Sequence, residues 1–499
     1  MVVIPETLVR HETYLYLLIS LLGVMIVLFN TQLGAFWGDD TYYYIQPARD
    51  FIEGNGFNPS YIFGPVLPFI LSIPGLLNID PLISVRWINA ILFGTNLYLL
   101  TLIIRKITAS PGFALCGGVL ILLSDVVIEI HGWAMSEALA IAFLLSSILS
   151  SLAYLETKRR VYGILTAVGT ALAVLTRFAM LPTIPAICLM YLIGDHARPF
   201  LQRLRNAILL GITSLIPILL YWLRNFLISG HPVRYEQYIQ TAFDRSQLIW
   251  WFYHWFSLFI PGRFLKGHEL SAGLILTFIT GLLLLVTFRI IHKARVASAS
   301  SLFKPGMILL GSLIVFNLLM LYLARGLTEL NIYNARYLVP IFIVFIAFSM
   351  SIFSRLWQVA GRYIKILMVA AFLLFLVYYS YRAVDFTLQT SSTGLGYSNI
   401  GWHQSETIRY LQEHPGLTDM VSTGEMGIYF WTGRKPTVLA AFTTPEALSE
   451  YMCAHGAPLF IMSQMPTEMY GFTHNEATRN LRLARQFNDA EMYVCQSSH

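Results

Sequence analysis

The sequence is poor in charged residues. Only 12% of its 499 residues are Asp, Glu, Lys or Arg, whereas 56% are hydrophobic, and the mean hydropathy is +0.62. A soluble chain of this length carries about twice that charged fraction. Several runs approach the roughly 20 apolar residues that cross a bilayer. The composition therefore excludes an ordinary soluble protein and predicts an α-helical polytopic membrane protein. The net charge of +6 reflects loop residues that orient helices, and it gives no indication of nucleic-acid binding.

Cysteine and glycosylation sites are also scarce. Of four cysteines, Cys116 and Cys188 fall in apolar runs, where we expect packing roles. Cys453 and Cys495 lie in a polar C-terminal stretch, and the sequence is compatible with either a disulfide between them or two free thiols. No Asn-x-Ser/Thr acceptor with a permitted middle residue occurs, which favours a prokaryotic source. The sequence also lacks a periodic repeat and a convincing Gly-rich nucleotide-binding loop.

The apolar runs predict eleven membrane spans. They cover residues 14–33, 83–104, 112–130, 134–155, 161–176, 178–194, 206–228, 272–290, 306–325, 337–354 and 363–382. No small-residue cleavage site follows the first run, so we interpret it as a retained helix. Lysine and arginine clusters such as 158–160 fall in alternate loops, which places the N-terminus in the cytoplasm. The predicted location is the cell membrane.

Two of the predicted outer loops are long. Loop 34–82 contains a predicted interfacial helix from Thr41 to Glu53 and an apolar piece, 64–77, that is too short to span. Loop 229–271 carries an aromatic cluster, which is typical of an interface belt and is also suited to shielding a lipid or stacking on a sugar. The cluster comprises Trp250, Trp251, Tyr253, His254 and Trp255.

The composition changes after about residue 382. Segment 395–499 alternates helix signals with short strand signals, which predicts a small α/β domain following the transmembrane domain 1–385. The helix signals cover 404–413, 445–455 and 475–487, and the strand signals cover 420–422, 437–440, 459–463 and 492–495. An odd number of spans places this domain outside the cell.

Two adjacent carboxylates, Asp39 and Asp40, directly follow the first span. Charge at the edge of a membrane is costly and is often kept for function, although an Asp here is equally suited to capping the next helix. Neighbouring residues do not share a helix face, so we expect different roles. One is a candidate general base for a hydroxyl group. The other is a candidate helix cap, or a ligand with Glu137 of a divalent cation.

Basic and aromatic residues recur at the same predicted face. Arg177, Arg224 and Arg336 each lie at the outer end of a span, where they are candidates to bind a phosphate by paired hydrogen bonds. A single arginine in such a place is more often an interface anchor, but three on one side favour a site. The candidate substrate-lining residues are Tyr43, His131 and Tyr337, whereas Asp125 and Glu129 have no assigned role.

Several of these segments together resemble one family. The segments 38–44 (GDDTYYY), 64–68 (GPVLP) and 136–139 (SEAL) are similar in order and spacing to outer-face motifs of the GT-C superfamily of glycosyltransferases. Segments 175–177 (LTR), 221–226 (YWLRNF), 230–232 (GHP) and 334–340 (NARYLVP) are similar to its later pieces. This superfamily includes protein O-mannosyltransferases and the aminoarabinose transferases of lipid A.

The resemblance implies a membrane glycosyltransferase of the hexosyl or pentosyl type. By it, Asp39 or Asp40 is the base, Glu137 is the second acidic site, and the donor is a sugar on a polyprenyl phosphate. The acceptor is a glycan, lipid or protein, and no nucleic acid is involved. The pair here is Asp-Asp where Asp-Glu is common, and Glu137 stands where Asp is frequent.

Two other interpretations remain open at this point. The first is a transporter or flippase of lipid-linked sugars, although its spans would carry ionisable residues near mid-membrane and these spans do not. The second is a scaffold whose role lies in the exterior α/β domain.

Overall fold

The computed structural model of the chain divides into two compact units. It describes residues 6–60, 62–196, 198–232, 253–260, 267–268, 271–278, 281, 289, 300–327 and 335–496. One unit comprises Met1–Thr31 with Tyr43–Leu388, and the other comprises Gln32–Tyr42 with Gln389–His499. The acidic stretch that follows the first helix therefore groups with the C-terminal part of the chain, whereas the sequence places the whole loop 34–82 in the transmembrane domain.

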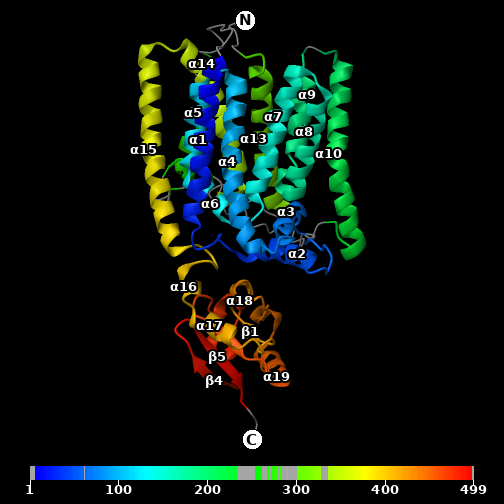
Figure 1. Ribbon diagram of the computed structural model, residues 1–499, viewed down its shortest axis with the longest axis vertical. Coiled ribbons are helices and arrows are strands. Elements are labelled where there is room, and N and C mark those ends of the chain that lie inside the picture. The colour runs from blue at the N-terminus through cyan, green and yellow to red at the C-terminus, as the bar shows by residue number, and fades with distance from the viewer. Residues whose placement is uncertain are drawn as a thin grey trace. The chain divides into compact units, whose positions relative to one another are not determined.

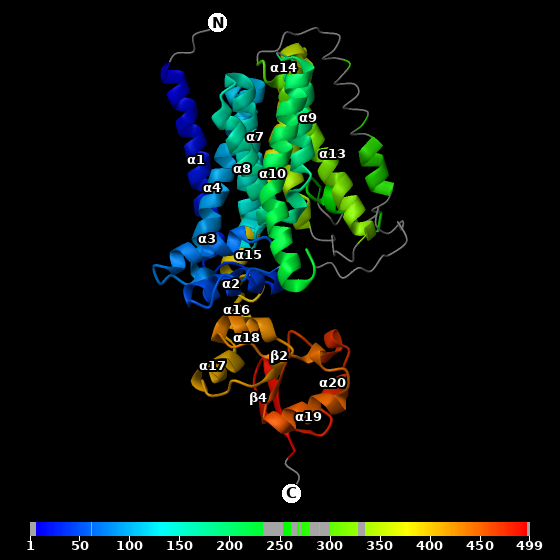
Figure 2. The same ribbon diagram turned by 90° about the vertical axis from the view of Figure 1, so that its right-hand side faces the viewer.

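The first unit is a bundle of apolar helices that run roughly along one direction (Figures 1 and 2). Its long helices are α1 (Glu6–Asn30), α4 (Pro81–Thr108), α7 (Glu137–Thr157), α8 (Arg160–Thr176), α10 (Phe200–Ser229), α13 (Phe303–Leu327), α14 (Val339–Val359) and α15 (Arg362–Thr393). Shorter helices are α5 (Pro111–Leu122), α6 (Asp125–Gly132) and α9 (Thr183–Gly194). The protein is a multi-pass membrane protein.

The count of eleven spans is not confirmed. Within the described residues, seven helices are long and apolar enough to cross a membrane, or eight if α5 and α6 form one bent span. The predicted fifth and sixth spans are shorter apolar helices, Arg160–Thr176 and Phe178–Gly194. The predicted eighth span, 272–290, lies largely outside the described residues. Apolar composition thus located the helices, but it did not show which of them are long enough to cross.

The predicted third span is broken. Helices α5 and α6 meet at an angle of 61°, because Ser124 between them has an extended backbone. Asp125, the first residue of α6, forms an ion pair of 2.7 Å with Arg382 of α15. This pair gives a structural role to an acid that sequence reasoning left without one.

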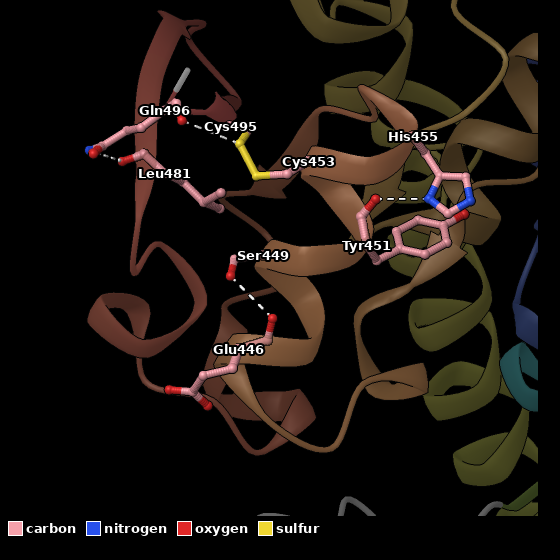
Figure 3. The surroundings of a disulfide bond; sticks show 8 residues. All are labelled: Glu446, Ser449, Tyr451, Cys453, His455, Leu481, Cys495 and Gln496. Carbon is pink, nitrogen blue, oxygen red and sulfur yellow. Dashed lines mark hydrogen bonds between the residues drawn. A yellow bond between two sulfur atoms is a disulfide. The ribbon is translucent and has the colours of Figure 1, made fainter. Parts of the chain in front are cut away.

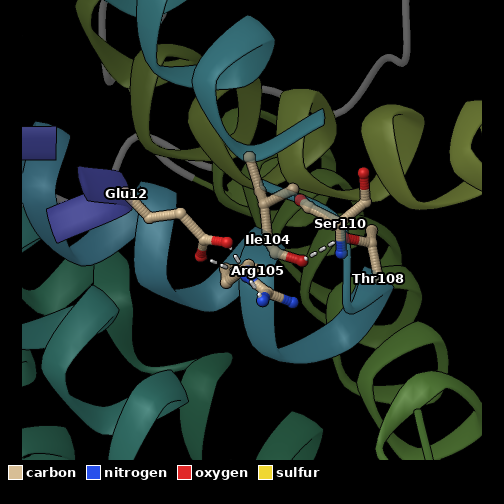
Figure 4. A network of polar contacts seen from close by, with 5 residues as sticks. All are labelled: Glu12, Ile104, Arg105, Thr108 and Ser110. Carbon is tan, nitrogen blue, oxygen red and sulfur yellow. Dashed lines mark hydrogen bonds and ion pairs between the residues drawn. The ribbon is translucent and has the colours of Figure 1, made fainter. Parts of the chain in front are cut away.

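Close helix contacts in the bundle depend on small residues and a few polar links. A Cβ on Gly94 of α4 would lie 2.7 Å from the backbone oxygen of Ser20 in α1, which shows how closely the two helices pack. At the far end of this pair, Glu12 and Arg105 form a 3.0 Å ion pair (Figure 4). The Thr108 hydroxyl accepts a hydrogen bond from the Ser110 amide and closes the end of α4.

Two short helices lie at one end of the bundle, α2 (Tyr42–Ile52) and α3 (Val66–Gly75), close to the predicted segments 41–53 and 64–77 (Figures 1 and 2). Arg49 in the last turn of α2 pairs with Asp80 at 3.0 Å, and Asp80 caps α4 by accepting from the Leu82 amide. Helix α2 is therefore fixed to the start of α4.

The second unit contains a five-stranded sheet in the order β2-β1-β3-β5-β4. The strands are β1 (Val421–Ser422), β2 (Thr437–Val438), β3 (Leu459–Met462), β4 (Leu481–Gln486) and β5 (Ala490–Cys495). Strand β1 is parallel to β2 and β3, whereas β5 is antiparallel to β3 and β4. The helices are α16 (Ile400–His403), α17 (Glu406–Glu413), α18 (Glu425–Thr432), α19 (Pro445–His455) and α20 (His474–Ala477). This is the predicted α/β architecture.

One predicted helix in this unit is wrong. Residues 475–487 form the end of α20 and then strand β4, because Asn480 adopts a left-handed conformation that ends the helical turn. The following Leu, Arg, Ala and Gln residues favour helices in isolation. Pairing with β5 supplies backbone hydrogen bonds that outweigh this weak preference.

The C-terminal cysteines are joined. Cys453 of α19 and Cys495 of β5 form a disulfide, with Cα atoms 5.2 Å apart (Figure 3). Cys116 and Cys188 in the bundle are free. Of the two possibilities that the sequence left open, the structure shows the disulfide, which is typical of an oxidising compartment.

Candidate active site

A buried carboxylate with two arginines lies in the membrane unit. Glu137 is the first residue of α7, and its side chain is 2% exposed. Arg177 follows the end of α8 in an extended conformation, and its Nη1 lies 3.0 Å from Oε1 of Glu137. Arg336 lies in the 3-10 turn Ala335–Tyr337 before α14, with its Nε 3.8 Å from the same oxygen. Two guanidinium groups thus share one carboxylate, which leaves a net positive charge.

The ring of Tyr337 contacts the guanidinium groups of both arginines. The guanidinium carbons of Arg177 and Arg336 lie 4.8 and 5.3 Å from the centre of its ring, within the range of cation–π attraction. Nη1 of Arg336 also lies 3.1 Å from the sulfur of Met135. We call Glu137, Arg177, Arg336 and Tyr337 the arginine cluster. The sequence predicted each of these residues as a site residue, and the structure brings all four together from three distant parts of the chain.

The second oxygen of Glu137 is a candidate contact for a ligand. Oε2 is buried and has no hydrogen-bond partner among the residues that the structure describes. Buried carboxylate oxygens almost always accept hydrogen bonds, and an exception calls for a ligand or a water molecule. A substrate hydroxyl group at this point would satisfy it.

Aromatic residues of α2 connect the first loop to the arginine cluster. The Tyr44 hydroxyl lies 3.0 Å from the Ser136 hydroxyl, directly before Glu137 in the chain. Tyr43 and Tyr44 both pack on Phe63, with ring centres 5.3 and 5.2 Å apart. Tyr43, predicted to line the substrate site, is thus part of an aromatic layer beside the Ser136 turn.

Gly64 allows the first loop to approach the hinge between α8 and α9, which contains Arg177, very closely. A Cβ at this position would lie 1.8 Å from the carbonyl oxygen of Leu175 and 2.8 Å from that of Thr176. No side chain fits there without moving the backbone, so only glycine permits the approach. The loop thereby buttresses the residues directly before Arg177.

Replacement of Gly64 by Ala is expected to displace this hinge and to destabilise the protein by at least about 1–3 kcal/mol, the usual cost of overpacking. Thermal unfolding in detergent measures the effect. Gly112→Ala is the matched control, because a Cβ on Gly112 meets nothing within 4 Å. Equal stability of the two variants would contradict the close contact.

His131 is a packing residue. Its ring is fully buried, with Nδ1 2.7 Å from the Val127 carbonyl and Nε2 3.0 Å from the Asn96 amide nitrogen. Nδ1 therefore donates and Nε2 accepts, which defines a neutral imidazole. Asn96 also donates to the Ala138 carbonyl at 3.0 Å. His131 is therefore linked through Asn96 to the first turn of α7.

Arg224 contacts residues of its own helix α10. Its Nη1 donates to the Asn225 side-chain oxygen at 3.0 Å, and its guanidinium carbon lies 5.8 Å from the Tyr221 ring centre. Tyr221 in turn donates to the carbonyl of Ser60 at 3.1 Å. The described contacts of Arg224 are thus to its own helix, and none of them is to a residue of the arginine cluster.

Part of the predicted aromatic loop can be placed. Trp250 and Trp251 lie outside the described residues. Trp255 packs edge-on against Phe345 of α14, with ring centres 5.5 Å apart. Trp255 is therefore held by the bundle itself.

The acidic pair lies in the second unit. Asp39 and Asp40 begin a 3-10 turn, Asp39–Thr41, which leads directly into α2. Oδ1 of Asp39 accepts a hydrogen bond of 2.5 Å from the hydroxyl of Tyr397. The Asp39 side chain is exposed and that of Asp40 is half-buried. Sequence reasoning missed Tyr397, because nothing local marks a tyrosine 358 residues away as a partner.

The carboxylate of Glu137 is bound by arginine side chains in this structure. A metal ion would have to displace these two guanidinium groups. In the described part of the chain, no group of three or more His, Cys, Asp or Glu residues is arranged to hold a metal. A metal bound by Asp40 and Glu137 remains a prediction, and no chemical step below depends on it.

Residues 62–222 match the model of a family described as dolichyl-phosphate-mannose-protein mannosyltransferase. No curated protein matches the sequence. Among solved structures, ArnT from Cupriavidus metallidurans bound to undecaprenyl phosphate is similar, with a TM-score of 0.58 and 10% identity over 96% of this chain and 98% of that chain. ArnT in the apo state gives a TM-score of 0.55 at 10% identity, over 95% of this chain and 97% of that one.

The chain has the fold of these two ArnT structures. A further similar structure is the oligosaccharyltransferase of Archaeoglobus fulgidus in complex with Zn and sulfate, with a TM-score of 0.53 and 14% identity over 95% of this chain and 73% of that one. The family match spans α3 to α10 and includes Glu137 and Arg177. The resemblance noted from short motifs is therefore confirmed.

Proposed function

We propose that the protein is a membrane glycosyltransferase that moves a sugar from a polyprenyl-phosphate donor to an acceptor hydroxyl at the extracytoplasmic face. The observation that carries the proposal is the arginine cluster. It places two guanidinium groups at one buried carboxylate, so the cluster has a positive charge suited to a lipid phosphate. The GT-C fold supports the same chemistry.

The proposed reaction is a direct displacement. The acceptor hydroxyl loses its proton to Asp39 or Asp40, and its oxygen attacks the anomeric carbon. The bond between that carbon and the phosphate oxygen breaks, and the electron pair leaves on the phosphate. Arg177 and Arg336 stabilise this developing charge, which is the step where fixed cations contribute most. The carboxylate of Glu137 holds the two guanidinium groups in place.

Binding of undecaprenyl phosphate to the purified protein tests the phosphate site. Arg336→Ala is expected to weaken binding by about 10- to 100-fold, because hydrogen bonds to charged groups contribute about 1.5–3 kcal/mol. Arg224→Ala is the control, since Arg224 contacts its own helix. Unchanged affinity in Arg336→Ala, or an equal loss in both variants, would contradict the assignment.

Transfer must then be shown directly. Lipid-linked sugars that accumulate in cells lacking the protein, identified by mass spectrometry, supply the donor for an assay with the purified wild type. Release of polyprenyl phosphate together with a glycosylated acceptor supports a transferase. Binding and movement of the intact donor across a vesicle membrane, with no sugar released, would instead support a flippase.

A further inference from the structure

The acidic segment is built into the second unit. The amide of Tyr397 donates to the carbonyl of Trp37 at 2.8 Å, and Trp37 forms a parallel β-bridge with Gly396. Gln32 donates its side-chain amide to the Ser391 carbonyl at 2.6 Å. Residues 32–42 are thus aligned with the last turn of α15 and the segment that follows it by side-chain and backbone hydrogen bonds that reach Ser391 and Tyr397.

Tyr397 is itself rigidly held. Its carbonyl accepts from the indole nitrogen of Trp431 at 2.8 Å. Its ring is 7% exposed and packs on Trp402 and Phe430, with ring centres 5.5 and 5.8 Å away. The hydroxyl group therefore stands at a fixed point, which makes it a precise anchor for whatever it touches.

The hydroxyl of this tyrosine donates to Oδ1 of Asp39 at 2.5 Å. Burial raises the pKa of Tyr397 above its ordinary value, and the hydrogen bond to Asp39 raises that pKa further, so the phenol keeps its proton and remains the donor. Burial also raises the pKa of Glu425, and the nearby charge of Asp39 adds to this. Asp39 is exposed, so its carboxylate remains accessible to a substrate.

We infer that Tyr397 is a positioning residue that fixes the carboxylate of Asp39, and that Asp39 is accordingly the base of the pair. This inference rests on the proposed function. A base must present its lone pair to the acceptor hydroxyl within hydrogen-bond distance, and a free aspartate rotates out of that geometry. One oxygen of Asp39 is held by Tyr397 and the other serves the acceptor.

Tyr397→Phe tests the inference, because it removes the hydroxyl and keeps the ring contacts. In the full-length enzyme, kcat for sugar transfer is expected to fall about 10- to 100-fold, since small misplacement of a reacting group has such effects. The KM for the lipid-linked donor and the thermal stability should stay unchanged. Tyr493→Phe is the matched control, because Tyr493 donates to Glu491 at 2.8 Å in the same unit.

A double-mutant cycle separates positioning from general damage. In an Asp39→Asn background, Tyr397→Phe should cause no additional loss, whereas its effect should persist fully in Asp40→Asn. Full activity of Tyr397→Phe would overturn the inference, and so would a loss of thermal stability that Tyr493→Phe does not share. If the wild type transfers no sugar, the proposed function fails as well. An active wild type with an active Tyr397→Phe rejects the inference alone.

Discussion

Asp39→Asn is expected to lower the rate of sugar transfer by about 10²–10⁴-fold, the usual contribution of a positioned general base. Asparagine has nearly the same shape and still accepts a hydrogen bond from Tyr397, but it does not take a proton from the acceptor. Asp40→Asn should cause a smaller loss. The rate is measured with purified protein and a lipid-linked donor under single-turnover conditions.

Two measurements make this result specific to catalysis. Affinity for undecaprenyl phosphate should remain unchanged in both variants, since the arginine cluster is intact. Glu53→Gln, which alters an exposed acid in the same loop, should keep full activity. Undiminished transfer by both Asp39→Asn and Asp40→Asn would refute the proposed role of the acidic pair.

Glu137→Gln is expected to destabilise the protein by about 3–5 kcal/mol, because removing one partner of a buried ion pair leaves the other charges without compensation. Glu137 is 2% exposed, and Arg177, which would lose its carboxylate, is 11% exposed. The free energy of unfolding in mixed micelles measures the loss. A double variant, Glu137→Gln with Arg177→Gln, should lose less than the sum of the two single variants.

The same helix offers a matched control. Glu156 in the last turn of α7 pairs with Lys106, but its side chain is 49% exposed. An exposed pair contributes only about 0–1 kcal/mol, so Glu156→Gln should be close to the wild type. Equal stability of Glu137→Gln and Glu156→Gln would show that the buried carboxylate does not organise the two arginines.

Sequence reasoning located the bundle and much of the site because both depend on composition and on local order. Long apolar runs mark helices wherever they fold, and Glu137, Arg177 and Arg336 stand at helix ends that a bundle brings to one face. The details that depend on tertiary contacts were not predictable. Residues 481–486 form a strand because β5 pairs with them, and no local pattern marked the extended backbone of Ser124 that breaks the third predicted span.

Tyr397 illustrates the same limit within the site. Its proposed role depends on a hydrogen bond to a residue 358 positions away in the sequence. Nothing in the residues around Tyr397 indicates this partner. His131 shows the reverse case. Its position in the chain favoured a role in the site, yet its two hydrogen bonds inside the bundle occupy both ring nitrogens.

The grouping of residues 32–42 with 389–499 affects how this protein can be recombined with its relatives. A chimera that exchanges only the C-terminal domain would pair a foreign Tyr397 equivalent with a native acidic segment, and the alignment at Trp37 and Gly396 would be lost. The exchangeable module is therefore discontinuous, and a productive hybrid needs both pieces from the same parent. The two pieces should accordingly change together when such enzymes diversify.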